Sequence, residues 1–443
     1  GGILADDMGL GKTLQVLSAI LALRDAPGAD RAPVLVVAPT SVLGTWAGEA
    51  RRFFPDLIVE VVDSTSRRRG GSLGALSTGV DVLVTSYTIV RMEPEEWAGL
   101  HLSGLVVDEA QAIKNPRTAI HSALMGLDAG WRVAVTGTPV ENSVSDLWSI
   151  LQVTDPGLLP GWKTFNDKMR RPIETHGDAS ALQRLRRLTA PFVLRRTKEQ
   201  VAPELPDKTE SVVEVALGEE HRRIYDQYLT RERSRLLGLL DDLQANRMVV
   251  LASITRLRQL ALDPALVDPA YSSVGSAKVE FLADQLDQVV PAGHQVLVFS
   301  QFTSFLARIR GVLERRGVEI AYLDGATRDR QGAIEEFRSG KARVFLISLK
   351  AGGTGLTLTE ADYVYVMDPW WNPAAEAQAV DRAHRIGQSK KVNVYRLVAE
   401  DTIEQKVLDL QDRKLQLVSA VVDGGGAGSG RITAEDLRAL LEF

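Results

Sequence analysis

The chain has 443 residues, of which 45% are apolar and 25% are charged, and it contains no cysteine. This composition is that of an ordinary globular protein, and the length predicts two or three domains, each able to bury its own core. The lack of cysteine excludes disulfide scaffolds, thiol catalysis and zinc sites with cysteine ligands. The net charge of −5 gives no general attraction to nucleic acid, so such binding would depend on local arginine clusters.

Other features of the sequence narrow the class of protein further. The six histidines are scattered and form no His-Glu-x-x-His pair, which argues against a catalytic zinc site. No apolar stretch approaches the roughly 18–20 residues of a membrane span, so we expect no membrane partner. The chain starts at Gly1 without a methionine, and we interpret it as a fragment or processed chain whose upstream part has been removed.

Short apolar runs, separated by helical stretches, occur in two clusters along the chain. Because the runs are apolar on both faces, they predict parallel strands covered by helices on both sides. The first cluster comprises residues 2–5, 33–38, 82–85, 105–107 and 132–136, and the second comprises 295–300, 319–323, 343–348, 363–367 and 393–398. Between the clusters, over about 142–275, strand signals nearly vanish and helical patterns replace them. The sequence therefore predicts an α/β protein with two parallel-sheet lobes and helical insertions between them.

The domain boundaries follow from this pattern. The predicted order is lobe 1 (1–200, with a helical insertion at about 142–190), a helical insertion and linker (201–274), lobe 2 (275–422, with a closing helix at about 401–422), and a Gly-rich tether with a short C-terminal helix (423–443).

A phosphate-binding loop is predicted directly after the first strand. The segment Asp6-Asp-Met-Gly-Leu-Gly-Lys-Thr13 has the strand, Gly-rich loop and helix that let backbone N–H groups converge on a phosphate. Lys12 would reach the β- and γ-phosphates, and the Thr13 hydroxyl would bind Mg²⁺. The strict pattern has Gly where this chain has Asp6, so an ordinary Gly-rich turn is the alternative. The predicted nucleotide-binding residues are Asp7, Met8, Gly9, Leu10, Gly11, Lys12 and Thr13.

Two adjacent carboxylates end the apolar run at residues 105–107. Asp108 would hold Mg²⁺ through water, and Glu109 would polarise the attacking water as the catalytic base. A solvated acidic turn is the alternative for this pair taken alone.

A third group of polar residues lies near the end of the second cluster. On a helix, Gln378, Arg382 and Arg385 would share one face, since they are spaced i, i+4 and i+7. Two arginines and a glutamine on one face suit the γ-phosphate of a nucleotide held by the other lobe, with arginine stabilising the transition state. A solvated basic helix face is the alternative, although it does not explain the segment Asp368-Pro-Trp-Trp-Asn-Pro373 just before it.

These motifs together resemble the motor of SWI/SNF-type ATPases, a branch of helicase superfamily two. The family's loop reads Asp-Glu/Asp-Met-Gly-Leu-Gly-Lys-Thr, so Asp6 is expected there. The other matching segments are Asp108–Gln111, Thr136–Asn142, Leu194–Lys198 with Glu204–Pro206, Val298–Phe302, Asp324–Gly325 with Arg330, Ser348–Leu356, Asp368–Pro373 and Arg382–Gln388. They occur in the family's order over roughly residues 1–420.

The resemblance implies two RecA-like lobes that bind ATP and Mg²⁺ between them and step along double-stranded DNA. It implies that Gln111, Thr136 and Thr138 couple hydrolysis to movement. It also implies contacts with the DNA backbone, which do not depend on base sequence. The implied DNA-binding residues are Thr40, Ser41, Trp46, Thr85, Ser86, Arg195, Arg196, Gln301, Gly325, Lys350, Gly352, Gly353 and Thr354. Helix caps for Thr40 and Ser41, and a core position for Trp46, are the alternatives.

Some features of the sequence depart from the family pattern, and the sequence does not decide between several related classes of protein. The family's adenine-contacting glutamine segment lies upstream of the loop, and this chain begins after it. Leu260–Pro264 stands where eukaryotic members often have a Cys/His-containing string, which favours a bacterial or archaeal member. We expect a DNA-bound protein target that the sequence does not name. The location would be cytoplasmic and nucleoid-associated in a prokaryote or nuclear in a eukaryote. The alternatives are a strand-separating helicase, a restriction-type translocase, and a DNA-binding fragment that hydrolyses ATP poorly.

Overall fold

The computed structural model describes residues 1–140, 143–237, 243–352, 356–370, 373–409 and 411–412. Within these ranges the chain divides into two units, residues 1–203 and 204–412, each with its own sheet and core. Among the helices within these ranges, none is both long and apolar enough to cross a membrane.

The first unit is built on a parallel sheet in the order β3-β4-β2-β5-β6-β1-β7. Its strands are β1 (Gly2–Leu4), β2 (Val34–Ala38), β3 (Val59–Val62), β4 (Val82–Ser86), β5 (His101–Asp108), β6 (Asp128–Val135) and β7 (Val193–Leu194). Its helices are α1 (Lys12–Arg24), α2 (Leu43–Phe53), α3 (Ser66–Arg69), α4 (Leu73–Leu76), α5 (Tyr87–Met92), α6 (Pro94–Ala98), α7 (Ala119–Met125), α8 (Val144–Thr154), α9 (Trp162–Phe165), α10 (Arg171–His176), α11 (Ala179–Thr189) and α12 (Lys198–Val201).

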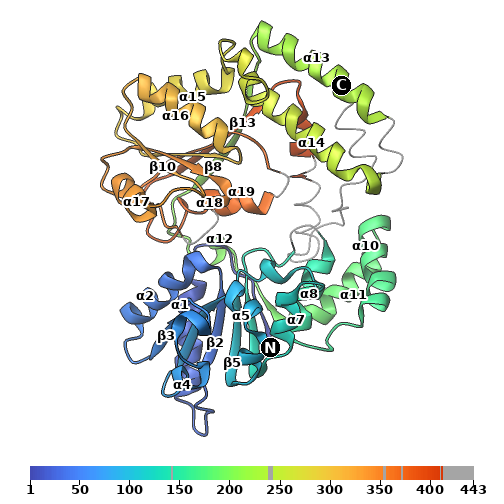
Figure 1. Ribbon diagram of the computed structural model, residues 1–443, viewed down its shortest axis with the longest axis vertical. Coiled ribbons are helices and arrows are strands. Elements are labelled where there is room, and N and C mark those ends of the chain that lie inside the picture. The colour runs from blue at the N-terminus through green and yellow to red at the C-terminus, as the bar shows by residue number, and fades with distance from the viewer. Residues whose placement is uncertain (141–142, 238–242, 353–355, 371–372, 410, 413–443) are drawn as a thin grey trace. The chain divides into compact units, whose positions relative to one another are not determined.

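Helices lie on both faces of this sheet (Figure 1), and each helical layer forms a hydrophobic core with it. In β2, Val34 and Val36 pack with α1 and α2, whereas Leu35 and Val37 pack with the helices of the opposite face. Side chains alternate between the faces of a strand, so a strand buried on both sides must be apolar throughout. The apolar run of β2 is thus explained by two helical layers.

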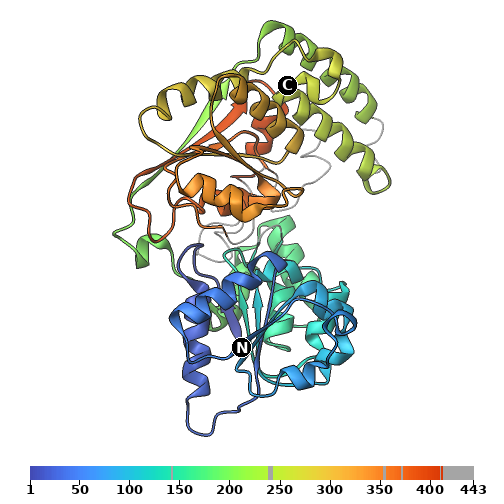
Figure 2. The ribbon, with the colours of Figure 1, turned by 60° about the vertical axis from the view of Figure 1, so that its left-hand side comes forward.

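The second unit has a parallel sheet in the order β10-β11-β9-β12-β13-β8. Its strands are β8 (Lys208–Val215), β9 (Val296–Ser300), β10 (Ile320–Leu323), β11 (Val344–Ser348), β12 (Tyr363–Val366) and β13 (Val392–Ala399). Its helices are α13 (Glu219–Leu237), α14 (Leu243–Leu262), α15 (Ala277–Val289), α16 (Thr303–Arg315), α17 (Arg330–Arg338), α18 (Leu349–Gly352) and α19 (Pro373–Val380). Helices again cover both faces of the sheet, as Figure 2 shows for each unit.

The predicted fold class is confirmed: both sheets are parallel and lie between helices. Each segment expected to be a strand contains one, with bounds that differ by one to a few residues. Three strands were not expected, namely β3, β7 and β8. Strand β8 lies at the edge of its sheet within the segment predicted as helical linker, and most of its side chains are exposed. An edge strand with one polar face carries no continuous apolar run, so the sequence pattern did not reveal it.

Candidate functional site

The phosphate loop joins the end of β1 to the first turn of α1. Gly9 and Gly11 have φ angles of 91° and 69°, a backbone region that glycine adopts readily and other residues rarely do. Helix α1 then begins at Lys12, and its N-cap residue is Gly11, which has no side chain to cap the first turn. An anion placed there would accept hydrogen bonds from the N–H groups of that turn at the positive end of the helix dipole.

The lysine of the loop lies across it. Lys12 Nζ donates hydrogen bonds to the carbonyl oxygens of Asp6 at 2.8 Å and Asp7 at 3.2 Å. A phosphate would compete with these carbonyls for the ammonium group. Gly137 packs on the same loop so closely that a Cβ atom there would come within 2.7 Å of the Met8 side chain. The residues predicted to bind nucleotide, Asp7 to Thr13, all belong to this loop or to the start of α1.

The adjacent carboxylates lie at the carboxyl end of β5. Asp108 Oδ2 accepts a hydrogen bond from Trp46 Nε1 at 2.8 Å, and the hydroxyl of Tyr87 donates to the Asp108 carbonyl. Burial and the neighbouring Glu109 charge raise the pKa of Asp108 to about 7, although Trp46 and Lys12 oppose the shift. Glu109 has a φ of 49°, in the left-handed region, so the chain turns sharply between the strand and the next helical turn.

The residues predicted to couple hydrolysis to movement form a hydrogen-bonded chain with Glu109. Gln111 Nε2 donates to Glu109 Oε2 at 2.8 Å, and Gln111 Oε1 accepts from the Thr136 hydroxyl at 3.0 Å. The Thr136 hydroxyl in turn accepts from the backbone N–H of Thr138 at 3.0 Å. Strands β5 and β6 are neighbours in the sheet, which brings these residues together at its carboxyl edge.

Three of the predicted DNA contacts of the first unit are buried. Trp46 is 1% exposed and donates to Asp108, so it occupies the core position that was the alternative. Thr85 is fully buried and donates to the Val62 carbonyl, and Ser86 caps α5 by accepting from Ile89 N. A buried side chain does not reach a DNA backbone, so these side chains support the site and do not form its surface. Thr40 and Ser41 are exposed, and neither the 3₁₀ turn Thr40–Val42 nor α2 begins with a side-chain cap.

Arg195 and Arg196, also predicted to contact DNA, pair with the phosphate loop. Arg196 donates to the buried carboxylate of Asp6 through Nε at 3.2 Å and Nη2 at 2.6 Å. Arg195 Nη2 lies 3.4 Å from Asp7 Oδ1. The sequence showed two arginines near a motor motif, but it did not show which carboxylates they would meet.

In the second unit, the two candidate arginines converge although they do not share a helix. Helix α19 ends at Val380, so Gln378 lies on the helix while Arg382 and Arg385 lie on the turns that follow. The prediction of one continuous helical face is therefore wrong. Arg382 Nη1 and Arg385 Nη1 nonetheless donate to the same Leu356 carbonyl, at 3.2 and 3.3 Å.

The DNA-binding candidates of the second unit differ in exposure. Gln301 follows β9 and is partly buried, and its Oε1 accepts from Arg258 Nη1 at 3.1 Å. Gly325 and Lys350 are exposed. Gly352 ends α18, and Gly353 and Thr354 lie outside the described residues.

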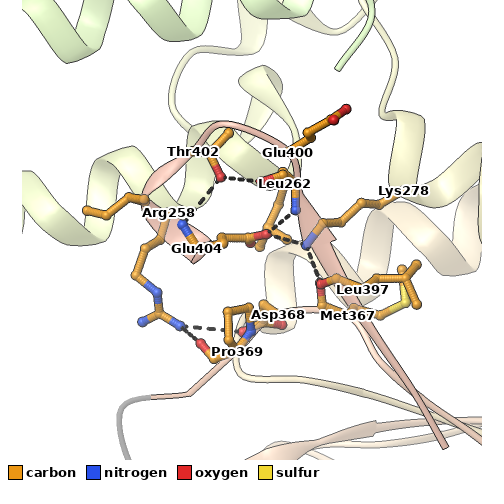
Figure 3. A network of polar contacts seen from close by, with 12 residues as sticks. Arg258, Leu262, Lys278, Met367, Asp368, Pro369, Leu397, Glu400, Thr402 and Glu404 are labelled. Atoms are coloured by element: carbon orange, nitrogen blue, oxygen red, sulfur yellow. Dashed lines mark hydrogen bonds and ion pairs between the residues drawn. The ribbon is translucent and has the colours of Figure 1, made fainter. Parts of the chain in front are cut away.

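A buried polar network holds the segment that follows β12 (Figure 3). Lys278 is fully buried, and its Nζ donates to Glu404 Oε2 at 2.5 Å and to the Met367 and Leu397 carbonyls, both at 2.8 Å. Arg258 is 3% exposed, donates to the Pro369 carbonyl and lies 3.9 Å from Asp368. Arg258 therefore supports this segment from within the same unit.

Sequence reasoning missed several members of these clusters. Lys278 carries no motif signal, because its role depends on partners distant in sequence. The position of Gln15 could have been predicted to be near the loop, since it lies one helical turn after Lys12 on α1. Its amide donates to the Leu10 carbonyl at 2.9 Å and to Asp6 Oδ2 at 3.1 Å.

Two parallel-sheet units and an uncapped phosphate loop beside paired carboxylates define a nucleotide-binding protein of the helicase-like class. The SNF2-related domain family matches residues 1–266, and the helicase conserved C-terminal domain family matches residues 277–387. The first match covers more than half of the chain, so the chain belongs to the SNF2-related family of helicase superfamily two.

Individual relatives agree with this assignment. The chain is 36% identical over 438 residues to the mouse chromodomain-helicase-DNA-binding protein 1-like, covering 96% of this chain and 48% of the relative. It is 34% identical over 447 residues to an uncharacterized ATP-dependent helicase of Mycoplasma pneumoniae, covering 100% of this chain and 42% of the relative. The chain thus spans less than half the length of these relatives. Among solved structures, the Sulfolobus solfataricus SWI2/SNF2 ATPase core in complex with dsDNA is 31% identical, with a TM-score of 0.46 and coverage of 100% of this chain and 93% of that chain.

The buried pair of Lys278 and Glu404 makes a prediction about stability. The variant Lys278→Met should lower the free energy of unfolding of the second unit by about 3–5 kcal/mol, because it leaves the Glu404 carboxylate buried without its cation. The double variant Lys278→Met/Glu404→Leu should recover much of this loss. Denaturant titration of each variant measures the effect.

The matched control is Lys341→Met, which breaks an exposed ion pair of the same unit, with Glu336 at 2.8 Å. This control should change stability far less, since exposed pairs contribute little. An equal loss in the Lys278 and Lys341 variants would contradict the interpretation of the buried pair.

Proposed function

We propose that the chain is the ATP-hydrolysing motor of a double-stranded DNA translocase, which moves along duplex DNA and displaces or remodels bound proteins. The observation that carries the proposal is the meeting of a phosphate loop and a carboxylate pair at the carboxyl edge of one parallel sheet. The family supports ATP use, and the mouse relative is named as a DNA-binding helicase. Ligands of open α/β sheets bind at this edge.

The residues present fit an Mg²⁺ ion. Asp108 has a raised pKa because it is a buried carboxylate beside a second one, and a cation would relieve that cost. Asp108 and the Thr13 hydroxyl would hold the ion, since Mg²⁺ in such sites uses one or two protein oxygens together with phosphate oxygens. When bound, Mg²⁺ supplies neutralisation of the charge on the β- and γ-phosphates.

The chain's own residues then have separate tasks. Lys12 exchanges the Asp6 and Asp7 carbonyls for phosphate oxygens, and Glu109 orients and deprotonates the attacking water. Gln111 already accepts from Thr136 and donates to Glu109, so a change at the base can pass to the end of β6. Arg385, with Arg382 and Gln378, stabilises the charge of the transition state.

The first test concerns the chemistry. Glu109→Gln should still bind ATP and Mg²⁺ but lose hydrolysis, because the phosphate loop is unchanged while the base is removed. Lys12→Ala should weaken ATP binding itself. Nucleotide binding and steady-state ATP turnover, each with and without duplex DNA, measure the two effects. Glu95→Gln, a change of an exposed acid on α6, serves as the control, and normal turnover in Glu109→Gln would refute the assignment.

The second test concerns DNA. Binding should be independent of base sequence and should weaken as salt rises, because contacts with phosphates release counterions. Duplex DNA should stimulate ATP turnover more than single-stranded DNA does, and no strand should be displaced. Stimulation by RNA alone, a strong base preference, or strand separation would favour one of the other helicase classes.

The third test concerns Arg385. If its guanidinium acts in the transition state, Arg385→Ala should lower kcat far more than it weakens ATP binding. By analogy with other arginine fingers, the loss is on the order of a thousandfold. Arg385→Lys should not restore activity, since an ammonium group lacks the planar two-pronged geometry. Arg328→Ala, at an exposed arginine of the same unit, is the control. DNA-stimulated turnover of Arg385→Ala within about threefold of the parent, a barrier change of roughly 0.7 kcal/mol, would remove this residue from the site.

A further inference from the structure

The first residue of the phosphate loop is a buried, fully bonded carboxylate. Asp6 has no exposed surface, and its Oδ1 accepts from the Arg196 backbone N–H at 3.0 Å and from Arg196 Nε at 3.2 Å. Its Oδ2 accepts from Arg196 Nη2 at 2.6 Å and from Gln15 Nε2 at 3.1 Å. Burial alone would raise the pKa of Asp6, but the hydrogen bonds from Arg196 and Gln15 outweigh it and hold the pKa below its usual range.

The next residue of the loop is tied to the same segment. The Asp7 backbone N–H donates to the Arg196 carbonyl at 3.0 Å, and Asp7 Oδ2 accepts from Lys198 N at 3.1 Å. Arg195 Nη2 lies 3.4 Å from Asp7 Oδ1. Two consecutive residues of the loop are therefore bound, through backbone and side chain, to residues 195–198.

The same two residues also hold the lysine. The Asp6 and Asp7 carbonyls accept from Lys12 Nζ, and Lys12 must leave them to reach a phosphate. Arg196 binds the side-chain carboxylate of Asp6. The position of the two backbone carbonyls that hold Lys12 therefore depends on the Asp6–Arg196 pair. Gln15 reinforces this arrangement, since its Oε1 accepts from Arg196 Nη2 at 2.5 Å while its amide donates to the loop at Leu10.

We propose that Arg196 is a positioning residue for ATP, which acts through Asp6 to hold the phosphate loop in its binding shape. The bidentate pair of a guanidinium and a buried carboxylate fixes both distance and orientation, which a single charge does not. The proposal rests on the proposed binding of ATP at this loop. It gives a physical reason for an aspartate where the general phosphate-loop pattern has glycine. It also places residues 195–198, which precede the second unit at Glu204 in the chain, in direct contact with the nucleotide loop.

The test separates this role from a DNA contact by Arg196. Arg196→Gln should raise the ATP dissociation constant about tenfold in the absence of DNA, because the loop loses a charged hydrogen-bond partner and must be ordered when ATP binds. The KM for ATP should rise by more than kcat falls. A DNA-contact role predicts the opposite, namely weaker DNA binding without nucleotide and an unchanged ATP dissociation constant.

A double-variant cycle shows whether Arg196 acts through Asp6. Asp6→Asn and Arg196→Gln should each weaken ATP binding, and the double variant should bind ATP no more weakly than Arg196→Gln alone, because both changes remove one interaction. If Arg196→Gln does not fold, Arg196→Lys replaces it, since this variant keeps the charge and loses the two-pronged geometry. Arg187→Gln, at an exposed arginine of α11, is the control and should behave as the parent.

Fluorescent ATP-analogue binding, DNA binding at fixed salt and thermal melting are measured on the full 443-residue chain. A weakened ATP affinity in variants that thermal melting shows to be folded at the assay temperature, with non-additive effects, supports the proposal; some fall in melting temperature is expected because Asp6 loses its cation. Unchanged ATP affinity in Arg196→Lys and Asp6→Asn overturns it and leaves the proposed function intact. A parent chain that binds no ATP overturns the proposed function and this inference together.

Discussion

The burial of both faces of two parallel sheets is the constraint on which the rest of the structure depends. Strands such as β2 and β11 are apolar along their length because helices cover each side, so polar residues have no place within them. Such residues are confined to the strand ends, and the carboxyl ends of parallel strands meet at one edge. Asp108 after β5 and Thr136 after β6 stand at that edge in the first unit, as Ser300 and Asp368 do in the second.

Buried charged groups need partners, and two of the buried carboxylates are paired with a cation from the same unit. Arg196 neutralises Asp6, and Lys278 neutralises Glu404. Asp108 is different, because burial and the neighbouring Glu109 charge raise its pKa to about 7 although Trp46 and Lys12 oppose the shift. The raised pKa of Asp108 thus marks the carboxyl end of β5 as a place in the first unit where burial opposes a negative charge.

Structural features that depend on residues close in sequence could be predicted from the sequence. Contacts between residues distant in sequence could not. The apolar runs, the phosphate loop and the carboxylate pair follow from local spacing, and the structure places them as expected. Strand β8 was missed because an edge strand needs only one apolar face. The resemblance implied DNA contacts for Arg196 and for Trp46, with a core position as the alternative for Trp46. Each side chain meets a carboxylate from a different part of the chain, Asp6 for Arg196 and Asp108 for Trp46. No single sequence specifies such a pairing before the topology is known.

The contacts that the arginines make within their own units limit which residues could form the proposed DNA-binding surface. Arg195, Arg196 and Arg258 bond to loop, strand-end or carboxylate groups of their own units, so their charge is already compensated. The exposed candidates that the structure describes are Thr40, Ser41, Gly325 and Lys350, of which only Lys350 is charged. The number of counterions released depends on how many phosphates are neutralised by cationic side chains. Hydroxyl and backbone N–H groups can hydrogen-bond a phosphate, but they neutralise no charge. Among these exposed candidates, Lys350 would therefore give the proposed DNA binding its dependence on salt, whereas the hydroxyl and backbone groups would add hydrogen bonds that release no counterion.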